Sequence, residues 1–357
     1  MKITAAFLGI VSILVVSCGD KKTDQNSELS TANMELKIEK LNDILKKYEE
    51  PSQLFNVSST KAQEVTGKKG TIIFVNPVDL ITEDGRPLGN SINVELKELM
   101  DQKQLLNTNA QTVSNGKLLI SGGAYFIKLT SGGQQLKLKE GKTMRVEFPK
   151  ITDRTMSLFY GQRDSLGAMN WEQDTEVLKQ KPNTSARDSI GEKTTKISEM
   201  DELLQYLGGD SLSEPLTKEQ KTKNDRTIRA YEKLYSAIEI KSFGWINCDR
   251  FWEVPNKTNL TVELNPSDSI NFANVYLVFK DINSIMSANC YSYKGKMNND
   301  RFENIPLGYK VRLVACSIKK DKVVSYASDM IINNNQTITL SMKETSDNEL
   351  KKLLNAK

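Results

Sequence analysis

Four cysteines, Cys18, Cys248, Cys290 and Cys316, are the residues of this chain best suited to covalent chemistry. A cysteine sulfur can form a disulfide, ligate a metal or act as a nucleophile, and metal and redox sites use particular spacings. None of the four lies in a Cys-x-x-Cys pattern, so the sequence predicts neither a metal site nor a dithiol redox site. If Cys18 is modified, three remain, and we expect buried thiols; a disulfide between Cys290 and Cys316 is the main alternative.

The surroundings of Cys18 predict an exported, lipid-modified N-terminus. Met1-Lys2 gives a short basic start, Ala5 to Val16 form an apolar run, and the small Ser17 precedes Cys18. The run is shorter than the about 20 residues needed to cross a bilayer, and it ends as an export signal does. Val15 to Cys18 resemble the lipobox of bacterial lipoproteins. The resemblance implies that Cys18 carries the lipid and becomes the first mature residue, with the outer membrane as the expected location; an ordinary secretory signal is the alternative.

The composition of the chain excludes several kinds of active site. It contains no histidine, which removes Ser-His-Asp and Cys-His nucleophilic sites, histidine-ligated zinc and the usual proton shuttle near neutral pH. The 49 Lys and Arg residues nearly balance the 45 Asp and Glu residues, and no basic cluster interleaved with aromatic residues indicates nucleic-acid binding. The sequence therefore predicts no catalytic residue, no metal site, no cofactor and no nucleic-acid partner.

The segment from Phe243 to Trp252 is the densest aromatic cluster in the chain. Trp245, Phe251 and Trp252 could line a groove, because flat aromatic faces stack on sugar rings or peptide side chains. Such clusters more often lie in a core, and we expect burial to dominate here. These three residues are the candidate binding residues that the sequence offers.

Two further patterns have simpler interpretations. Gly141-Lys142-Thr143 resembles the end of a phosphate-binding loop, but Leu136 stands where that loop requires glycine and a strand is expected to follow, so we interpret it as a turn. Glu95 and Glu98 could pair as acid and base. However, Glu95 lies in an alternating strand with its side chain expected in water, and scattered surface charge is the better explanation.

Short strands separated by glycine-containing turns dominate the rest of the sequence. Ile92, Val94 and Leu96 alternate with polar residues, and Val275 to Phe279 is a continuous apolar run, as in half-buried and fully buried strands. Met34 to Tyr48 instead has the apolar spacing of an amphipathic helix. These patterns predict a mainly β protein with two β-sandwich domains, short helical connectors and an N-terminal amphipathic helix.

Changes in composition give the expected boundaries of the segments. Polar residues after Cys18 predict a flexible tether, and a second polar stretch separates the two halves. The expected segments are a signal peptide (1–17), a tether (18–33), an amphipathic helix (34–50), an N-terminal β-sandwich (67–172), a linker (173–199), a helical connector (200–240), a C-terminal β-sandwich (241–343) and a C-terminal helix (344–357).

The segment from Gly67 to Pro149 resembles the ZU5-like β-sandwich modules. The features that carry the resemblance are the turn Asp84-Gly85, the strand at Glu95-Leu96, the hairpin Ser114 to Leu118, and the run from Gly122-Gly123 to Gly132-Gly133 and Phe148-Pro149. Such modules mostly serve in interaction and assembly, and some cleave themselves at a His-Phe-Ser site. Self-cleavage by that route is not implied here, because the chain has no histidine.

Together these patterns predict a lipid-anchored envelope protein that is not an enzyme and acts as a scaffold or protein-binding module. Its expected partners are the membrane, through the lipid on Cys18, and another protein of the envelope. A glycan-binding protein that uses the aromatic cluster is the first alternative. A carboxylate-dependent glycoside hydrolase, which would need two acidic side chains in one cleft, is the second.

Overall fold

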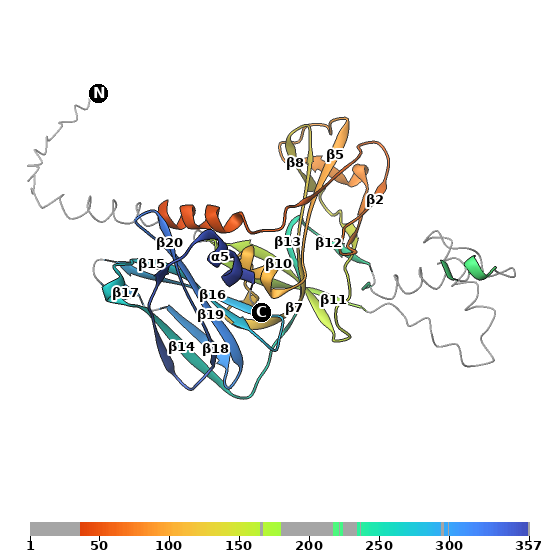
Figure 1. The fold of residues 1–357 in the computed structure, drawn as a ribbon. Coiled ribbons are helices and arrows are strands. Elements are labelled where there is room, and N and C mark those ends of the chain that lie inside the picture. Colours follow the sequence, from red (N-terminus) through yellow and green to blue (C-terminus); the bar gives the residue numbers. More distant parts are fainter. Residues whose placement is uncertain are drawn as a thin grey trace, which may run out of the picture.

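The computed structural model of this chain is mainly β, which confirms the fold class predicted from the sequence. It describes residues 36–164, 167–179, 217–220, 222–223, 234–235, 237–293, 296–298 and 300–355. Two β-sandwiches pack against each other, and a helix over residues 36–46 lies along their junction (Figure 1). The predicted signal peptide and tether, and with them Cys18, lie outside the described residues.

The first sandwich consists of a nine-stranded sheet and a four-stranded sheet. The path of the larger sheet is β1 (Gln53–Ser58), β5 (Ser91–Leu99), β7 (Lys117–Ser131), β13 (Gly244–Phe251), β10 (Met156–Arg163) and β11 (Met169–Leu178), with β4 (Leu80–Thr82), β6 (Val113–Ser114) and β8 (Gln134–Leu138) off this path. The smaller sheet has the order β12 (Ile238–Ile240), β9 (Met144–Glu147), β3 (Ile72–Val75) and β2 (Gln63–Thr66). Ile92, Val94 and Leu96 alternate as predicted and are fully buried in the core of this sandwich.

Strand β13 departs most from the expected domain organisation. The sequence suggested a C-terminal sandwich that starts at residue 241, but β13 pairs with β7 on one side and with β10 on the other. β12 also joins the first sandwich, by pairing with β9. The second sandwich therefore begins after Trp252, because the alternation of a strand does not reveal which sheet the strand joins.

A β-bulge interrupts the pairing of β7 with β13 at the centre of the sheet. A Cβ atom at Gly122 would lie 2.5 Å from the carbonyl oxygen of Cys248, and Gly123 has a φ of +124°. The register between the two strands shifts at the same level, between Asn247 and Asp249. The two glycines let the backbones approach closely, so that β7 continues as a single strand of 15 residues.

The second sandwich packs a six-stranded sheet on a three-stranded one. The larger has the order β17 (Lys296–Asn298), β16 (Ile285–Tyr293), β15 (Phe272–Phe279), β19 (Lys310–Lys319), β20 (Lys322–Ile331) and β22 (Lys343–Glu344); the smaller has the order β18 (Asp300–Pro306), β14 (Lys257–Leu264) and β21 (Gln336–Leu340). All eight residues of β15 are buried. One face of β15 covers the core of its own sandwich and the other covers the junction, which explains the continuous apolar run in the sequence.

A third core fills the junction between the two sandwiches. It contains Ile38, Leu41 and Leu45 from the helix over residues 36–46, which confirms the predicted amphipathic helix, although Leu36 of the expected stripe is exposed. The short helices α2 (Gln102–Asn107) and α5 (Asp347–Asn355) add further apolar side chains to this core. Helix α2 was not expected from the sequence, and a capping box between Asp101 and Gln104 defines its start.

Backbone hydrogen bonds join the two sandwiches as well. The Thr112 N–H donates to the carbonyl oxygen of Ile285 at 2.8 Å, and the Ser121 N–H donates to that of Asn283 at 2.9 Å. The Asn283 side-chain amide in turn donates to the Ser121 carbonyl at 3.0 Å. The sandwiches therefore share an apolar core and a hydrogen-bonded seam, which makes independent motion of the two units costly.

Several expected connecting segments lie mostly outside the described residues. The first six residues of the expected linker (173–199) continue β11 to Leu178, and the structure does not describe the linker from residue 180 onward. Of the expected helical connector (200–240), residues 218–220 and 222–223 are helical, and its last residues form β12. Within the described ranges, no helix is long and apolar enough to cross a membrane.

We expect the folded protein to stay in one piece when its chain is cut between β11 and β12. A protease recognition sequence inserted after Gly191 leaves β13 on the second fragment, where it remains paired with both β7 and β10. After cleavage, the fragments should co-elute in gel filtration and separate only in denaturant. Elution of two independent fragments from native buffer would contradict the strand order, and the uncut insertion variant is the control.

Candidate functional site

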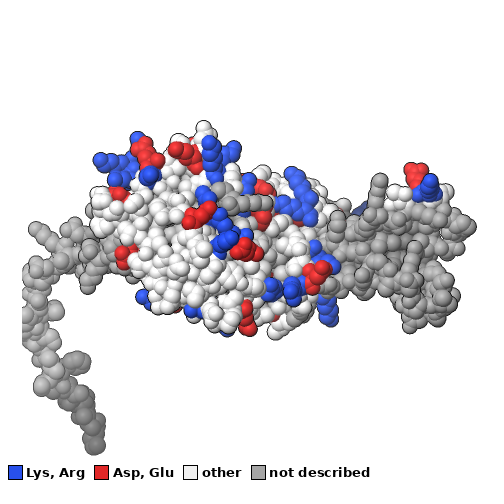
Figure 2. Space-filling model, turned by 60° about the horizontal axis from the view of Figure 1, so that its bottom comes forward, with Lys and Arg blue, Asp and Glu red and all other residues white. Residues whose placement is uncertain are grey.

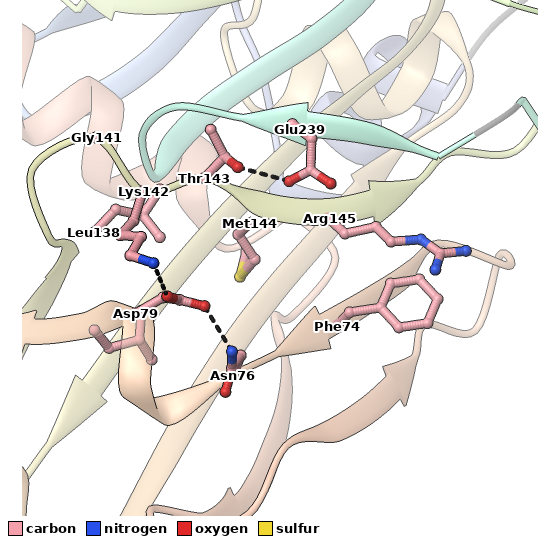
Figure 3. A pocket seen from close by; sticks show the side chains of 11 residues that line it. Phe74, Asn76, Asp79, Leu138, Gly141, Lys142, Thr143, Met144, Arg145 and Glu239 are labelled. Carbon is pink, nitrogen blue, oxygen red and sulfur yellow. Dashed lines mark hydrogen bonds and ion pairs between the residues drawn. The ribbon is translucent and has the colours of Figure 1, made fainter.

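A polar pocket lies on the outer face of the four-stranded sheet, beside the 3-10 helix η1 (Pro77–Asp79) (Figure 3). Its volume is about 450 Å³, which falls within the range of small-molecule sites. We call it the outer pocket. The polar and aromatic side chains that line it are Phe74, Asn76, Asp79, Lys142, Thr143, Arg145 and Glu239.

The pairing of neighbouring strands places several of these side chains next to one another. Glu239 of β12 lies opposite Arg145 of β9. On the other side of β9, the Arg145 guanidinium lies over the ring of Phe74 on β3, 4.2 Å from its centroid. Phe74 in turn lies opposite Glu64 of β2, which is outside the pocket lining. Glu239, Arg145, Phe74 and Glu64 therefore form one row across the outer face of the sheet.

Two carboxylates stand on different walls of the outer pocket. Asp79 Oδ2 accepts a hydrogen bond from Asn76 Nδ2 at 2.7 Å, and Asp79 Oδ1 lies 3.3 Å from the ammonium of Lys142. Glu239 Oε2 accepts a hydrogen bond from the Thr143 hydroxyl at 2.8 Å. A carboxylate has about four acceptor positions, so both residues keep capacity for a ligand.

The sequence analysis did not propose the outer pocket. It interpreted Gly141-Lys142-Thr143 as a turn, and the structure shows a turn: the Lys142 N–H donates to the carbonyl oxygen of Lys139, and Gly141 has a φ of +69°. This turn presents Lys142 and Thr143 to the pocket. Alternation could have indicated that Phe74, Arg145 and Glu239 face outward, but their register is a long-range property.

The aromatic residues proposed from the sequence are divided between two cores. Trp245 and Phe251 are half-buried against the core of the junction, and Trp252 packs against the core of the second sandwich. The Trp245 ring lies 5.1 Å from the ring of Phe126, and the Arg163 guanidinium lies 5.1 Å from its centroid. The three side chains therefore do not form one continuous platform.

Charge on the visible surface is dispersed. In Figure 2, Lys and Arg side chains occur in small groups mixed with Asp and Glu, and wide uncharged areas separate these groups. This view agrees with the near balance of charges in the composition. It shows no extended basic surface of the kind that binds a nucleic-acid backbone.

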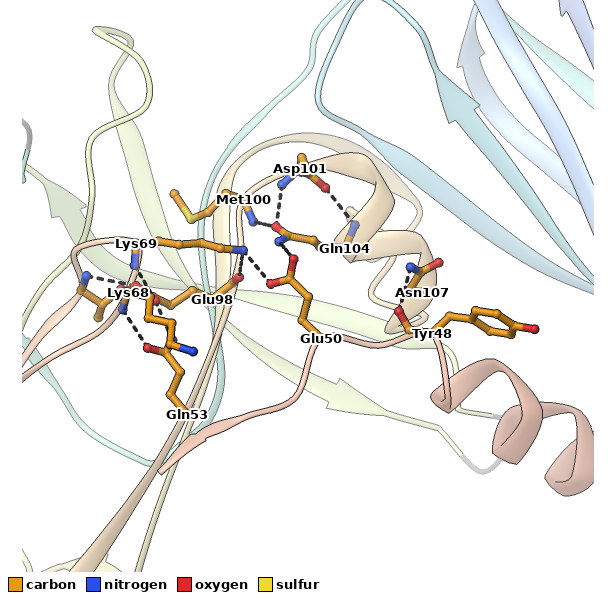
Figure 4. Close-up of polar contacts among 11 residues, drawn as sticks. Tyr48, Glu50, Gln53, Lys68, Lys69, Glu98, Met100, Asp101, Gln104 and Asn107 are labelled. Atoms are coloured by element: carbon orange, nitrogen blue, oxygen red, sulfur yellow. Dashed lines mark hydrogen bonds and ion pairs between the residues drawn. The ribbon is translucent and has the colours of Figure 1, made fainter. Parts of the chain in front are cut away.

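Four hydrogen bonds hold the carboxylate of Glu98 in the first sandwich (Figure 4). Its Oε1 accepts from the N–H and the hydroxyl of Thr71, at 3.0 and 2.6 Å, and its Oε2 accepts from the Lys69 N–H and Gln53 Nε2, at 2.9 and 2.8 Å. Gly67 makes room for this carboxylate, since a Cβ there would lie 2.8 Å from Glu98 Cδ. Glu95 points to the opposite face of β5, so the two carboxylates cannot act as a pair.

A second set of polar contacts fastens the chain between the N-terminal helix and β1. Glu50 accepts from Gln104 Nε2 at 2.6 Å and lies 3.0 Å from the Lys69 ammonium, which also donates to the Glu98 carbonyl (Figure 4). Partial burial raises the pKa of Glu50, but the bonds from Gln104 and Lys69 outweigh it, so the pKa lies below its usual value. These groups serve in structure, since they link α2, β5 and the loop before β3.

Asp249 is fully buried at the bulge between β7 and β13. Its Oδ2 accepts from Asn247 Nδ2 at 2.5 Å, and the Ser121 hydroxyl donates to Asn247 Oδ1 at 3.2 Å. Burial raises the pKa of Asp249 well above its usual value, although Ser121, Gly122 and Asn247 favour the charged form. The group is a carboxyl held within the sheet, closed off from any ligand.

The three cysteines of the described region are buried thiols, as predicted. Cys290 lies in the core of the second sandwich and Cys316 in the core of the junction, on strands either side of β15. No disulfide joins these two residues. Burial raises the pKa of the Cys316 thiol to about 12 and that of Cys248 well above its usual value, so neither is a reactive thiolate.

In the described part of the chain, no group of three or more Cys, Asp or Glu side chains is placed to hold a metal ion. Comparison with known protein families and with curated proteins finds no significant match to this sequence. We therefore infer the function from the residues of this chain alone.

We expect Glu98→Ala to lower the free energy of unfolding by about 3 kcal/mol, because two backbone N–H groups and a buried hydroxyl lose their acceptor. Urea unfolding measures the change. The matched control is Glu95→Ala on the same strand, which removes a single hydrogen bond from Ser52 and should cost at most about 1 kcal/mol. Equal losses in the two variants would contradict the role given to Glu98.

We also expect Asp249→Asn to flatten the dependence of stability on pH. An Asp carboxyl in the unfolded chain loses its proton above about pH 4, whereas burial raises the pKa of Asp249 in the folded protein well above its usual value. Folding therefore takes up a proton, and this contribution to stability is lost as pH rises through the folded pKa. The uncharged asparagine lacks this contribution.

Thermal unfolding of both proteins between about pH 4 and pH 8 measures this effect. Asp43→Asn, at an exposed position of the N-terminal helix, is the control and should keep the parent's pH dependence. An unchanged slope in Asp249→Asn would show that Asp249 is ionised in the folded protein.

Proposed function

We propose that this chain is a lipid-anchored protein of the bacterial cell envelope that binds a partner and has no catalytic activity. The observation that carries the proposal is the N-terminal pattern: a basic start, an apolar run, and Val15 to Cys18 in the order of a lipobox. The thiol of Cys18 would carry the lipid, and the outer membrane is the proposed location.

The way the chain enters the folded body supports this proposal. Ile38, Leu41 and Leu45 hold the helix over residues 36–46 in the junction core. Lys40 of the same helix lies 2.6 Å from Asp321 in the turn between β19 and β20. A tether that ends in this helix would join the two sandwiches at a fixed point. It would therefore limit the orientations that the sandwiches can take relative to the membrane.

We propose that the faces of the sandwiches bind a partner protein. A resemblance of residues 67–149 to ZU5-like modules is consistent with such a role, since those modules mostly serve in interaction and assembly. The absence of histidine is consistent with a non-catalytic role.

A glycoside hydrolase is a second candidate, favoured by one observation. Asp79 and Glu239 both line the outer pocket, as a carboxylate-dependent mechanism would require. Release of sugar from nitrophenyl glycosides, lost in both Asp79→Asn and Glu239→Gln, would establish this function in place of the non-catalytic one.

Replacement of the lipidated cysteine tests the anchor. In the Cys18→Ser variant, we expect the protein to move from the membrane pellet to the soluble fraction, because membrane residence would depend on the acyl chains. The matched control is Ser17→Ala, which keeps a small residue before the cysteine and should remain in the pellet.

Metabolic labelling with a fatty acid gives a second measurement. The parent and Ser17→Ala should take up the label, and Cys18→Ser should not. A Cys18→Ser variant that is processed and stays in the pellet, or a parent protein that takes up no label, would overturn the anchoring proposal.

A further inference from the structure

We propose that the outer pocket binds a neutral saccharide. This inference rests on the proposed function only in that it assigns a ligand to a binding protein; it does not depend on the lipid anchor. It also differs from the glycan site that the sequence suggested, because Trp245, Phe251 and Trp252 lie outside this pocket.

The charges of the pocket balance one another, which favours a neutral ligand. Asp79 and Glu239 contribute two carboxylates, and Lys142 and Arg145 contribute two cations. Lys142 lies 3.3 Å from Asp79, and Arg145 lies 3.0 Å from Glu147, a buried carboxylate outside the lining. The two carboxylates would repel an anion, and Lys142 and Arg145 would repel a cation. The pocket therefore favours a ligand without net charge.

The polar groups of the pocket match the hydroxyls of a sugar. A hydroxyl donates one hydrogen bond and accepts others, so a sugar needs donors and acceptors close together. The carboxylates of Asp79 and Glu239 are acceptors, the cations are donors, and the Asn76 amide and Thr143 hydroxyl are both. Charged partners make these hydrogen bonds stronger than neutral ones.

Apolar side chains of the pocket complement the apolar faces of a sugar ring. Phe74 and Leu138 line the pocket and are only partly buried, so their apolar groups are within reach of a ligand. A sugar ring carries its C–H groups on its faces and its hydroxyls around its rim. It can therefore place one face over these apolar groups while its hydroxyls reach the polar walls.

The backbone elements that carry the polar groups are themselves held in place. β9 lies between β12 and β3, and the Lys139 N–H donates to the carbonyl oxygen of Asp79 at 2.9 Å. The turn after β8 is thus fixed to η1, across the pocket from Glu239 (Figure 3). Because the site is preformed, little free energy is lost in ordering its side chains and backbone when the ligand binds.

Calorimetric titration of the mature chain tests the proposal. The probes are methyl glycosides of glucose, galactose, mannose and N-acetylglucosamine, with the corresponding neutral disaccharides. Glucuronic acid, glucosamine and a zwitterionic dipeptide are the charged comparisons. We expect at least one neutral sugar to bind more tightly than all of the charged comparisons.

Two variants and a matched control locate the site. Asp79→Asn and Glu239→Gln should each weaken sugar binding by about tenfold or more, as expected when a hydrogen bond to a charged group is lost. Glu64→Gln makes the same change in charge on the same face but outside the pocket, and should bind sugar like the parent. Melting temperatures close to the parent's show that each variant is folded.

Three outcomes would overturn the proposal: no neutral sugar binds, the dipeptide or a charged sugar binds more tightly than the neutral ones, or Glu64→Gln weakens binding as much as the pocket variants. Failure here leaves the fractionation result for Cys18 unaffected, and loss of the anchor leaves the titration unaffected. Hydrolysis of a bound glycoside would support saccharide recognition and overturn the non-catalytic function.

Discussion

The pairing of β13 with both β7 and β10 is the constraint on which the rest of the structure depends. This strand comes from beyond the residues that separate the two halves of the sequence, yet it lies in the centre of the first sheet. One of its faces contributes Ile246 and Cys248 to the core of the first sandwich. The other packs Trp245 and Phe251 against the junction core, so a single strand holds two of the three cores together.

Local sequence patterns predicted individual elements well, because periodicity depends only on which faces of an element are covered. Alternation identified β5, the unbroken apolar run identified β15, and a helical stripe identified the helix over residues 36–46. The same patterns could not assign β13, because a strand that suits one sheet suits another equally well. Register between residues far apart in the chain decides that question.

The candidate site was harder to predict than the fold for the same reason. Phe74, Arg145 and Glu239 come from three strands, and each looks like an ordinary outward-facing residue in its own segment. The clustering of aromatic residues in one segment drew attention instead to Trp245 and Trp252. Those side chains serve in packing, while the polar pocket is assembled from residues that the sequence keeps apart.

The central position of β13 has a consequence for biogenesis. A chain that emerges N-terminus first presents β7 and β10 as open edges until residues 244–251 follow, because no earlier segment fills the gap between them. Such edges are templates for pairing with other chains, and contacts between distant residues form slowly. The incomplete sheet is therefore prone to pair with other chains while synthesis is under way, and a truncation before β13 should aggregate.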